Sequence, residues 1–223
     1  MSAVPLSLAV GFAATLFSLV PAVGVAWFLE RSRSAVRGLV HTLVMMPLVL
    51  PPVVVGYLLL KIFSPRGAVG RALVALHCPV AFHWLGAVVA AAVVGFPLFV
   101  QAVALAMKAV DPRLEQASRT LGCPPVRTFF RITLPLAWPG ILAGAAVSFA
   151  RGLGEFGATI ILAGRIPGET ETIPLAIYGE LDAPGGEGRI GGLVAASVVL
   201  CFVCVVLART LDRRHQRRLE LDR

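Results

Sequence analysis

Residues 108–135 read KAVDPRLEQASRTLGCPPVRTFFRITLP and form a polar, basic segment between two long apolar runs. Asp111 is placed to be the N-cap of a short helix, Pro112 suits its first position, and Glu115 favours its first turn. Gly122 then ends the helix, and the two prolines that follow prevent it from continuing. The segment therefore predicts a short exposed helix, a sharp turn, and a second stretch that enters the next apolar run.

Long apolar runs extend outward from this segment in both directions. A helix that crosses the roughly 30 Å hydrocarbon core needs about 20 apolar residues, and five segments meet that length. They are Val4–Leu29, Gly38–Leu60, Leu85–Met107, a run from Leu134 toward Ala163 that Arg151 and Glu155 interrupt, and the run between Arg189 and Arg209. The sequence predicts an all-α, polytopic transmembrane bundle of five spans. A six-span alternative splits the fourth run, which is short for two crossings but allows a broken helix.

Positive charge is unevenly distributed between the two sides of this bundle. With the N-terminus outside, the inner segments 30–37, 108–133 and 209–223 hold 14 of the 20 Lys and Arg residues. The outer segments 61–84 and 164–190 hold five. Because cytoplasmic loops carry the excess of positive charge, this count places the N-terminus outside and the opening segment inside the cell.

The composition disfavours the soluble classes of protein. Of 223 residues, 57% are hydrophobic and 14% are charged, and the mean hydropathy is +0.85. A typical soluble domain has roughly 45–50% apolar and about 25% charged residues. The net charge of +8 therefore reflects membrane topology, and no nucleic-acid partner is expected. Residues 1–223 are predicted to form a single transmembrane domain.

The chain carries no recognisable catalytic signature. It lacks the phosphate-binding loop G-x-x-x-x-G-K-[ST], and its four cysteines show no metal-ligand spacing beyond the pair Cys201 and Cys204. That pair lies in an apolar run, where free cysteine is a common buried residue. We expect no enzymatic activity, no metal and no cofactor in this chain, so energy for any active transport must come from a separate subunit.

The opening segment resembles the E-A-A-x3-G-x9-I-x-L-P loop of ATP-binding-cassette (ABC) importer permeases. The matching residues are Gln116, Ala117, Ser118, Gly122, Ile132, Leu134 and Pro135, with Gln116 in place of the family's Glu and Glu115 one position earlier. In that family the loop is a coupling helix that sits in a groove of the ATPase subunit. The resemblance implies a type I importer permease, with residues 108–135 as the cytoplasmic coupling loop.

Other stretches resemble the molybdate permeases of this family. They are PLVLPPVVVGYLLL at 47–60, FARGLGEFGATIILAG at 149–164, RIPGETETIPLAIY at 165–178 and APGGE at 183–187. Sulfate permeases also resemble ARGLGEFGA, so the outer-loop stretch IPGETETIPLAIY is the more discriminating. The resemblance implies a multi-pass protein of the bacterial inner membrane that translocates molybdate. A sulfate or tungstate permease is one alternative, and an ATPase-independent secondary transporter or channel is another.

The same resemblance implies several partners. Two cytoplasmic ABC ATPase subunits, which bind the ATP, would engage residues 111–125. A molybdate-binding protein would dock outside, on residues 61–84 and 164–190. Five spans are few to enclose a gated path, so a homodimer in the lipid membrane is expected.

Arg151 and Glu155 are the charged residues inside the fourth run. Four residues apart on one helix face, they can pair. Charged groups at membrane depth are costly and usually face a partner, a cavity or a pathway. Two interpretations stay open: a structural pair that neutralises itself, or a pair that lines an anion path.

Prolines interrupt the second run at Pro47, Pro51 and Pro52. Proline removes backbone donors and bends helices, and such defects are tolerated where the backbone lines a cavity or packs in protein. We expect either a bend that lines the pathway or a kinked scaffold helix.

Small residues recur every four positions in the fourth run, at Gly140, Gly144, Ser148 and Gly152. Such a ridge allows close approach of another helix. It predicts a packing seam, either within the chain or across a dimer axis.

Overall fold

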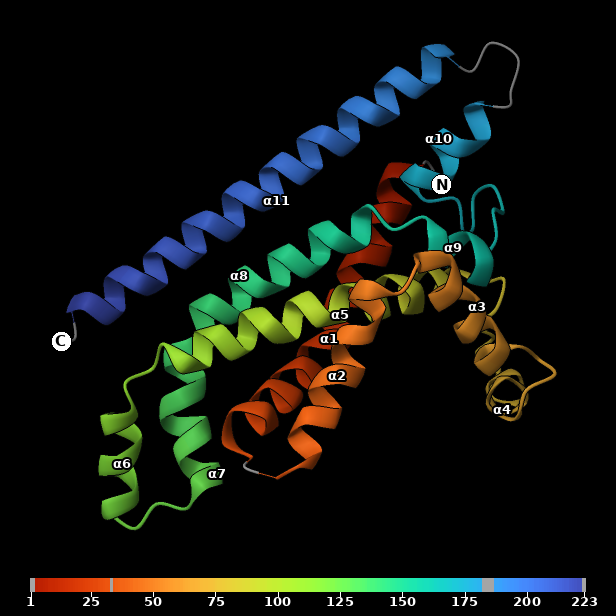
Figure 1. Ribbon diagram of the computed structural model, residues 1–223. Coiled ribbons are helices and arrows are strands. Elements are labelled where there is room, and N and C mark those ends of the chain that lie inside the picture. The colour runs from red at the N-terminus through yellow and green to blue at the C-terminus, as the bar shows by residue number, and fades with distance from the viewer. Residues whose placement is uncertain (1–2, 33, 182–186, 222–223) are drawn as a thin grey trace.

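The computed structural model describes residues 3–32, 34–181 and 187–221, and its regular elements are all helices (Figure 1). In chain order they are α1 (Ala3–Arg31), α2 (Val36–Val49), α3 (Pro52–Phe63), α4 (Ala68–Ala75), α5 (Trp84–Lys108), α6 (Pro112–Thr120), α7 (Pro125–Thr128), the π-helix η1 (Phe129–Thr133), α8 (Leu134–Leu153), α9 (Gly157–Leu162), α10 (Ile173–Leu181) and α11 (Glu187–Leu221). Within this description, four helical stretches can cross a membrane, and the bent pair α2–α3 makes a fifth. The predicted all-helical transmembrane fold is confirmed. The APGGE stretch lies almost entirely outside the described residues.

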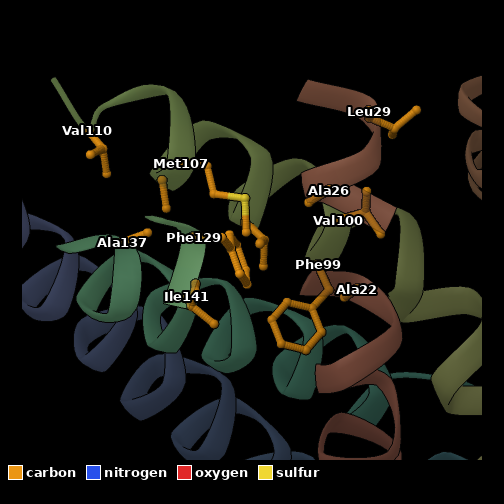
Figure 2. Packing of buried hydrophobic residues seen from close by; sticks show 12 residues of the cluster. Ala22, Ala26, Leu29, Phe99, Val100, Met107, Val110, Phe129, Ala137 and Ile141 are labelled. Carbon is orange, nitrogen blue, oxygen red and sulfur yellow. The ribbon is translucent and has the colours of Figure 1, made fainter. Parts of the chain in front are cut away.

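Helix α5 is the centre of the bundle and packs against α1 and α8 (Figure 1). Figure 2 shows the cluster of buried hydrophobic residues where these helices meet. Its buried side chains come from α1 (Ala22, Ala26, Leu29), α5 (Phe99, Val100, Val103, Ala106, Met107), the segment after α5 (Val110), η1 (Phe129) and α8 (Ala137, Ile141). Alanines on facing helices let the backbones approach closely, and the larger side chains fill the remaining space.

Helix α11 lies along the outside of α8 and is the least buried span (Figure 1). Only 6% of its most apolar window is buried in the bundle, and side chains such as Val198 and Phe202 are more than 60% exposed. An apolar surface of this size is costly in water. The exposed face of α11 is therefore covered by lipid or by protein in the membrane.

The second apolar run is not one continuous crossing. The chain direction bends by 115° between α2 and α3. The break lies at Leu50 and Pro51, whose backbones are extended. Pro51 precedes the first residue of α3, Pro52, which suits a helix start because its missing donor has no partner there. Pro47 lies inside α2. The Pro51–Pro52 pair therefore ends one helix and begins another, and that this bend lines the pathway stays a prediction.

The fourth run is also broken, and helix begins before the run does. Helix α8 ends at Leu153, and α9 begins at Gly157. At the other end, helix continues without interruption from Pro125 into α8, so Leu134 is not the start of a helix. The turn at η1 is wide, with the Leu134 N–H donating to the Phe129 carbonyl five residues back. The wide turn accommodates Pro135, which cannot donate and would crowd a normal helical turn.

Candidate functional site

The segment between α5 and α8 is built from strong local signals. The Asp111 carboxylate accepts a hydrogen bond of 2.9 Å from the backbone N–H two residues on, which caps α6. At the other end Gly122 has a φ of +82°. The Gly122 N–H donates to the Arg119 carbonyl, and the Cys123 N–H donates to the Ser118 carbonyl. This pair of bonds is a Schellman motif, and it requires the left-handed conformation that glycine adopts most easily.

Glu115 joins this helix to the membrane bundle. It is 6% exposed, accepts a hydrogen bond of 2.5 Å from the Thr133 hydroxyl of η1, and forms an ion pair with Arg31 at the end of α1. Gln116, which occupies the family's Glu position, is exposed, as is Ala117. Glu115 is therefore the group that holds α6 against α1 and η1. Its partners, Arg31 and Thr133, were not predicted from the sequence. Thr133 could have been proposed as a partner, because it is the variable residue of the Ile-x-Leu-Pro motif.

A second contact holds the helix in the same orientation. The hydroxyl groups of Ser118 and Thr128 lie 3.0 Å apart, and both residues are buried. Of the other residues of the loop motif, Ile132 and Leu134 are half-buried, while Gly122 and Pro135 are exposed. The loop therefore presents Glu115 and Ser118 toward η1 and α7, and leaves Gln116 and Ala117 on its outer surface.

The two breaks in the membrane runs lie against each other. A Cβ atom on Gly56 of α3 would lie 2.8 Å from the Ala158 backbone of α9, and one on Gly157 would lie 2.9 Å from Pro52. These approaches need glycine, because any side chain would meet fixed backbone or a rigid ring. We call this contact between α3 and α9, with the breaks that precede them, the break junction. Pro51, Pro52 and the Arg151–Glu155 region, predicted separately, therefore belong to one structural feature.

Glu155 is buried at the break junction, with only 2% of its side chain exposed. One carboxylate oxygen pairs with Arg151 at 3.1 Å, and the other accepts a hydrogen bond of 2.8 Å from the Ala158 N–H in the first turn of α9. The two charges do not share one continuous helix face as predicted, because α8 has ended before Glu155. A buried carboxylate needs such partners, and both of its oxygens have them here. Arg151 is partly exposed, at 31%.

The ridge of small residues faces α5 within the same chain. A Cβ atom on Gly144 would lie 2.7 Å from Ala102 Cβ, and one on Gly95 of α5 would lie 2.9 Å from Ser148 Oγ. At Gly152 the nearest atom would be 3.5 Å away, which is ordinary contact. Gly140 is buried further along the same helix. Of the two seams that the sequence allowed, the one within the chain is present.

The outer loop after α9 is organised by a threonine that sequence reasoning missed. Thr170 is fully buried; its hydroxyl accepts from the Ile166 N–H at 2.8 Å and donates to the Gly164 carbonyl at 2.9 Å. The loop is tied to α1 by a 2.7 Å hydrogen bond from the Ile173 N–H to Ser7 Oγ. Nothing in the local sequence points to Ser7, which lies 166 residues away. Among the described residues, no group of three His, Cys, Asp or Glu side chains could hold a metal ion.

Comparison with known proteins gives a consistent result. The family described as "Binding-protein-dependent transport system inner membrane component" matches residues 22–220. The "Molybdenum transport system permease protein ModB" of Escherichia coli K12 is 48% identical, over 97% of this chain and 95% of its own length. The "Sulfate transport system permease protein CysT" of Salmonella typhimurium is 35% identical, over 96% of this chain and 78% of its own length. A chain of the inward-facing MetNI methionine ABC transporter has a similar fold, with a TM-score of 0.60 at 18% identity, covering 98% of this chain and 94% of its own.

Proposed function

Because the chain belongs to the family of binding-protein-dependent transport system inner membrane components, we propose that it is the permease subunit of an importer for molybdate. It would carry the anion across the cytoplasmic membrane. The sequence has no nucleotide-binding loop, so a separate ABC ATPase would bind and hydrolyse the ATP.

The observation that carries this proposal is the buried Glu115. It connects one short cytoplasmic helix to two parts of the bundle at once, through Arg31 on α1 and Thr133 on η1. A displacement of α6 by an ATPase subunit would therefore move α1 and the start of α8 together. A loop that served only to connect two spans would not need a buried carboxylate with two partners.

The outer surface of the same loop is suited to a protein partner. Leu114 and Leu121 are 47% and 84% exposed on or next to α6, and Val126 and Phe130 are 55% and 61% exposed in the stretch that follows. Exposed apolar side chains close together on a polar loop are typical of interaction sites. We assign this surface to the ATPase, one copy for each permease subunit.

We infer that the translocation path runs along the break junction. Broken helices at membrane depth are tolerated where they are buried in protein or line a cavity, and charged groups there often mark a pathway. A second copy of the chain would complete the path, because the described residues of one chain offer five spans at most. The ordered outer loop around Thr170 would receive the substrate-loaded binding protein.

Molybdate is favoured over sulfate by the degree of similarity. The molybdenum permease shares 48% of its residues with this chain, and the sulfate permease shares 35% and extends beyond it. Tungstate has the same charge and shape as molybdate, so tungstate transport by the same route is part of the proposal.

Uptake of labelled molybdate into proteoliposomes tests the proposal. The vesicles contain this chain with or without its ATPase, with binding protein on one side and ATP on the other. We expect uptake that needs the ATPase, survives a large excess of sulfate and is reduced by tungstate. Uptake without the ATPase would indicate a secondary transporter or channel, and uptake abolished by sulfate would change the substrate.

A further inference from the structure

We propose that the cytoplasmic end of the bundle contains a binding site for a phosphate-type anion, supplied by the headgroup of an acidic phospholipid of the inner leaflet. The site is a cavity of about 550 Å³ between the end of α1, the start of α2, and the α6–α7 loop. It is lined by Trp27, Glu30, Arg31, Ser32, Arg37, Arg119, Pro125, Thr128, Phe129 and Thr133. It is separate from the break junction and from the ridge of small residues.

The charge of the cavity favours an anion. Three guanidinium groups from three different elements line it, against one carboxylate. The carboxylate, Glu30, lies 3.5 Å from Lys108, and Arg31 is paired with Glu115. Arg37 and Arg119 form no ion pair within the described residues. Two such arginines lining one cavity provide the forked donors that suit phosphate oxygens.

A hydroxyl group adds a neutral donor. Ser32 accepts a hydrogen bond from the Ser34 N–H at 3.2 Å, which leaves the Ser32 O–H able to donate into the cavity. The hydroxyls of Thr128 and Thr133 are engaged with Ser118 and Glu115. Arg37, Arg119 and Ser32 are therefore available as donors to a ligand.

The depth of the cavity points to a lipid rather than to a soluble ligand. It lies where α1 reaches its first charged residues and where Trp27 lies one turn inward, which is the usual position of an interfacial aromatic residue. Cytoplasmic leaflets carry anionic lipids, and basic pockets between transmembrane helices on that side bind their headgroups. Trp27, which is only partly buried, would contact the glycerol and upper acyl region.

Occupancy of this site would stabilise the coupling loop. Arg31 lines the cavity and also holds Glu115 of α6, and Arg119 belongs to α6 itself. A bound phosphate would therefore link the start of α2 to the coupling helix through two arginines. The inference does not depend on which anion the protein transports.

Tryptophan fluorescence tests the site directly. The full chain in non-ionic detergent, with Trp84→Phe and Trp138→Phe so that Trp27 alone reports, is titrated with short-chain phosphatidylglycerol, with phosphatidylcholine of equal chain length, and with inorganic phosphate. We expect a saturable change with phosphatidylglycerol and none with phosphatidylcholine. Replacing both Arg37 and Arg119 by Gln should raise the half-saturating concentration about tenfold or more.

The control is a pair of exposed arginines on the outer side, Arg66→Gln with Arg71→Gln, which removes the same charge and should leave the titration unchanged. If the Arg37/Arg119 variant does not fold, raising salt on the parent protein from about 0.05 to 0.5 M should weaken binding instead. A response to phosphate alone, lost with the two arginines, would make free phosphate the ligand. An unchanged titration in the Arg37/Arg119 variant, an equal response to phosphatidylcholine, or no response to either phosphate source would overturn the site.

Discussion

The coupling loop and the break junction are both interruptions of apolar helix, but they arise in different ways. The loop is specified by neighbours in sequence: an aspartate cap, a glycine at φ +82° and a proline pair, all within 15 residues of one another. The junction is formed by segments about 100 residues apart, where Gly56 meets Ala158 and Gly157 meets Pro52. The loop can keep its shape while it moves as a unit, whereas the junction changes whenever α3 and α9 separate.

This difference suggests a division of roles. A locally specified helix can be displaced by a partner without unfolding, because its capping bonds move with it. A contact between two half-helices without a shared backbone is suited to opening and closing. Glu115 connects the two regions, because it joins α6 to α1 and to the continuous helix that ends at the junction.

The largest effect is expected at the centre of the break junction. Gly56→Ala places a methyl group against the Ala158 backbone, which cannot rotate away, so we expect a loss of about 3 kcal/mol in stability. The thermal unfolding midpoint in detergent measures it. Gly24→Ala in α1 is the control, since nothing lies within 4 Å of its Cβ position, and alanine there should stabilise the helix slightly. Equal midpoints for the two variants would contradict the close contact.

Breaking the ion pair at the junction should have the next largest effect. Arg151→Gln leaves the buried Glu155 carboxylate with only its backbone partner, at a cost of about 2 kcal/mol. Uptake and unfolding midpoint are measured for Arg151→Gln, Glu155→Gln and the double variant. If the double variant regains both, the pair is structural. If it regains the midpoint but not uptake, Arg151 also acts on the transported anion.

The ridge of small residues on α8 should be sensitive to substitution at Gly144 and not at Gly152. Gly144→Ala would crowd Ala102, so we expect a loss of about 1.5 kcal/mol in stability, whereas Gly152→Ala meets only ordinary contact distances and should be neutral. The two unfolding midpoints are compared directly. A larger loss at Gly152 would place the tight contact elsewhere, across a dimer axis.

The smallest effect is expected in the coupling loop, at Gly122. Alanine at a φ of +82° costs about 1 kcal/mol, and no other atom lies within 4 Å of the Cβ position, so packing is unaffected. Gly122→Asn, which tolerates this conformation better, is the matched control. We expect a lower unfolding midpoint for Ala than for Asn. The same midpoint for both would mean that the left-handed turn does not contribute to stability.

The contrast between the two regions also explains what the sequence could predict. The spans and the ends of α6 follow from apolar run lengths and capping residues, which act locally. Pro51 and Pro52 predict an interruption of the second run. The 115° bend between α2 and α3 depends on α9 packing against α3, and no pattern of neighbouring residues predicts that contact. Glu155 was expected on a helix face because its four-residue spacing from Arg151 gives no sign that α8 ends first.

We propose that Glu115, and not its exposed neighbour Gln116, transmits motion from the ATPase to the bundle. The ratio of molybdate imported to ATP hydrolysed in proteoliposomes tests it most directly, for the parent protein, Glu115→Gln and the control Gln116→Ala. Glu115→Gln weakens the contacts to Arg31 and Thr133 and leaves the exposed loop surface unchanged. We predict that ATP hydrolysis continues while import per ATP falls several-fold, with Gln116→Ala close to the parent. An unchanged ratio in Glu115→Gln, or an equal fall in Gln116→Ala, would contradict the account.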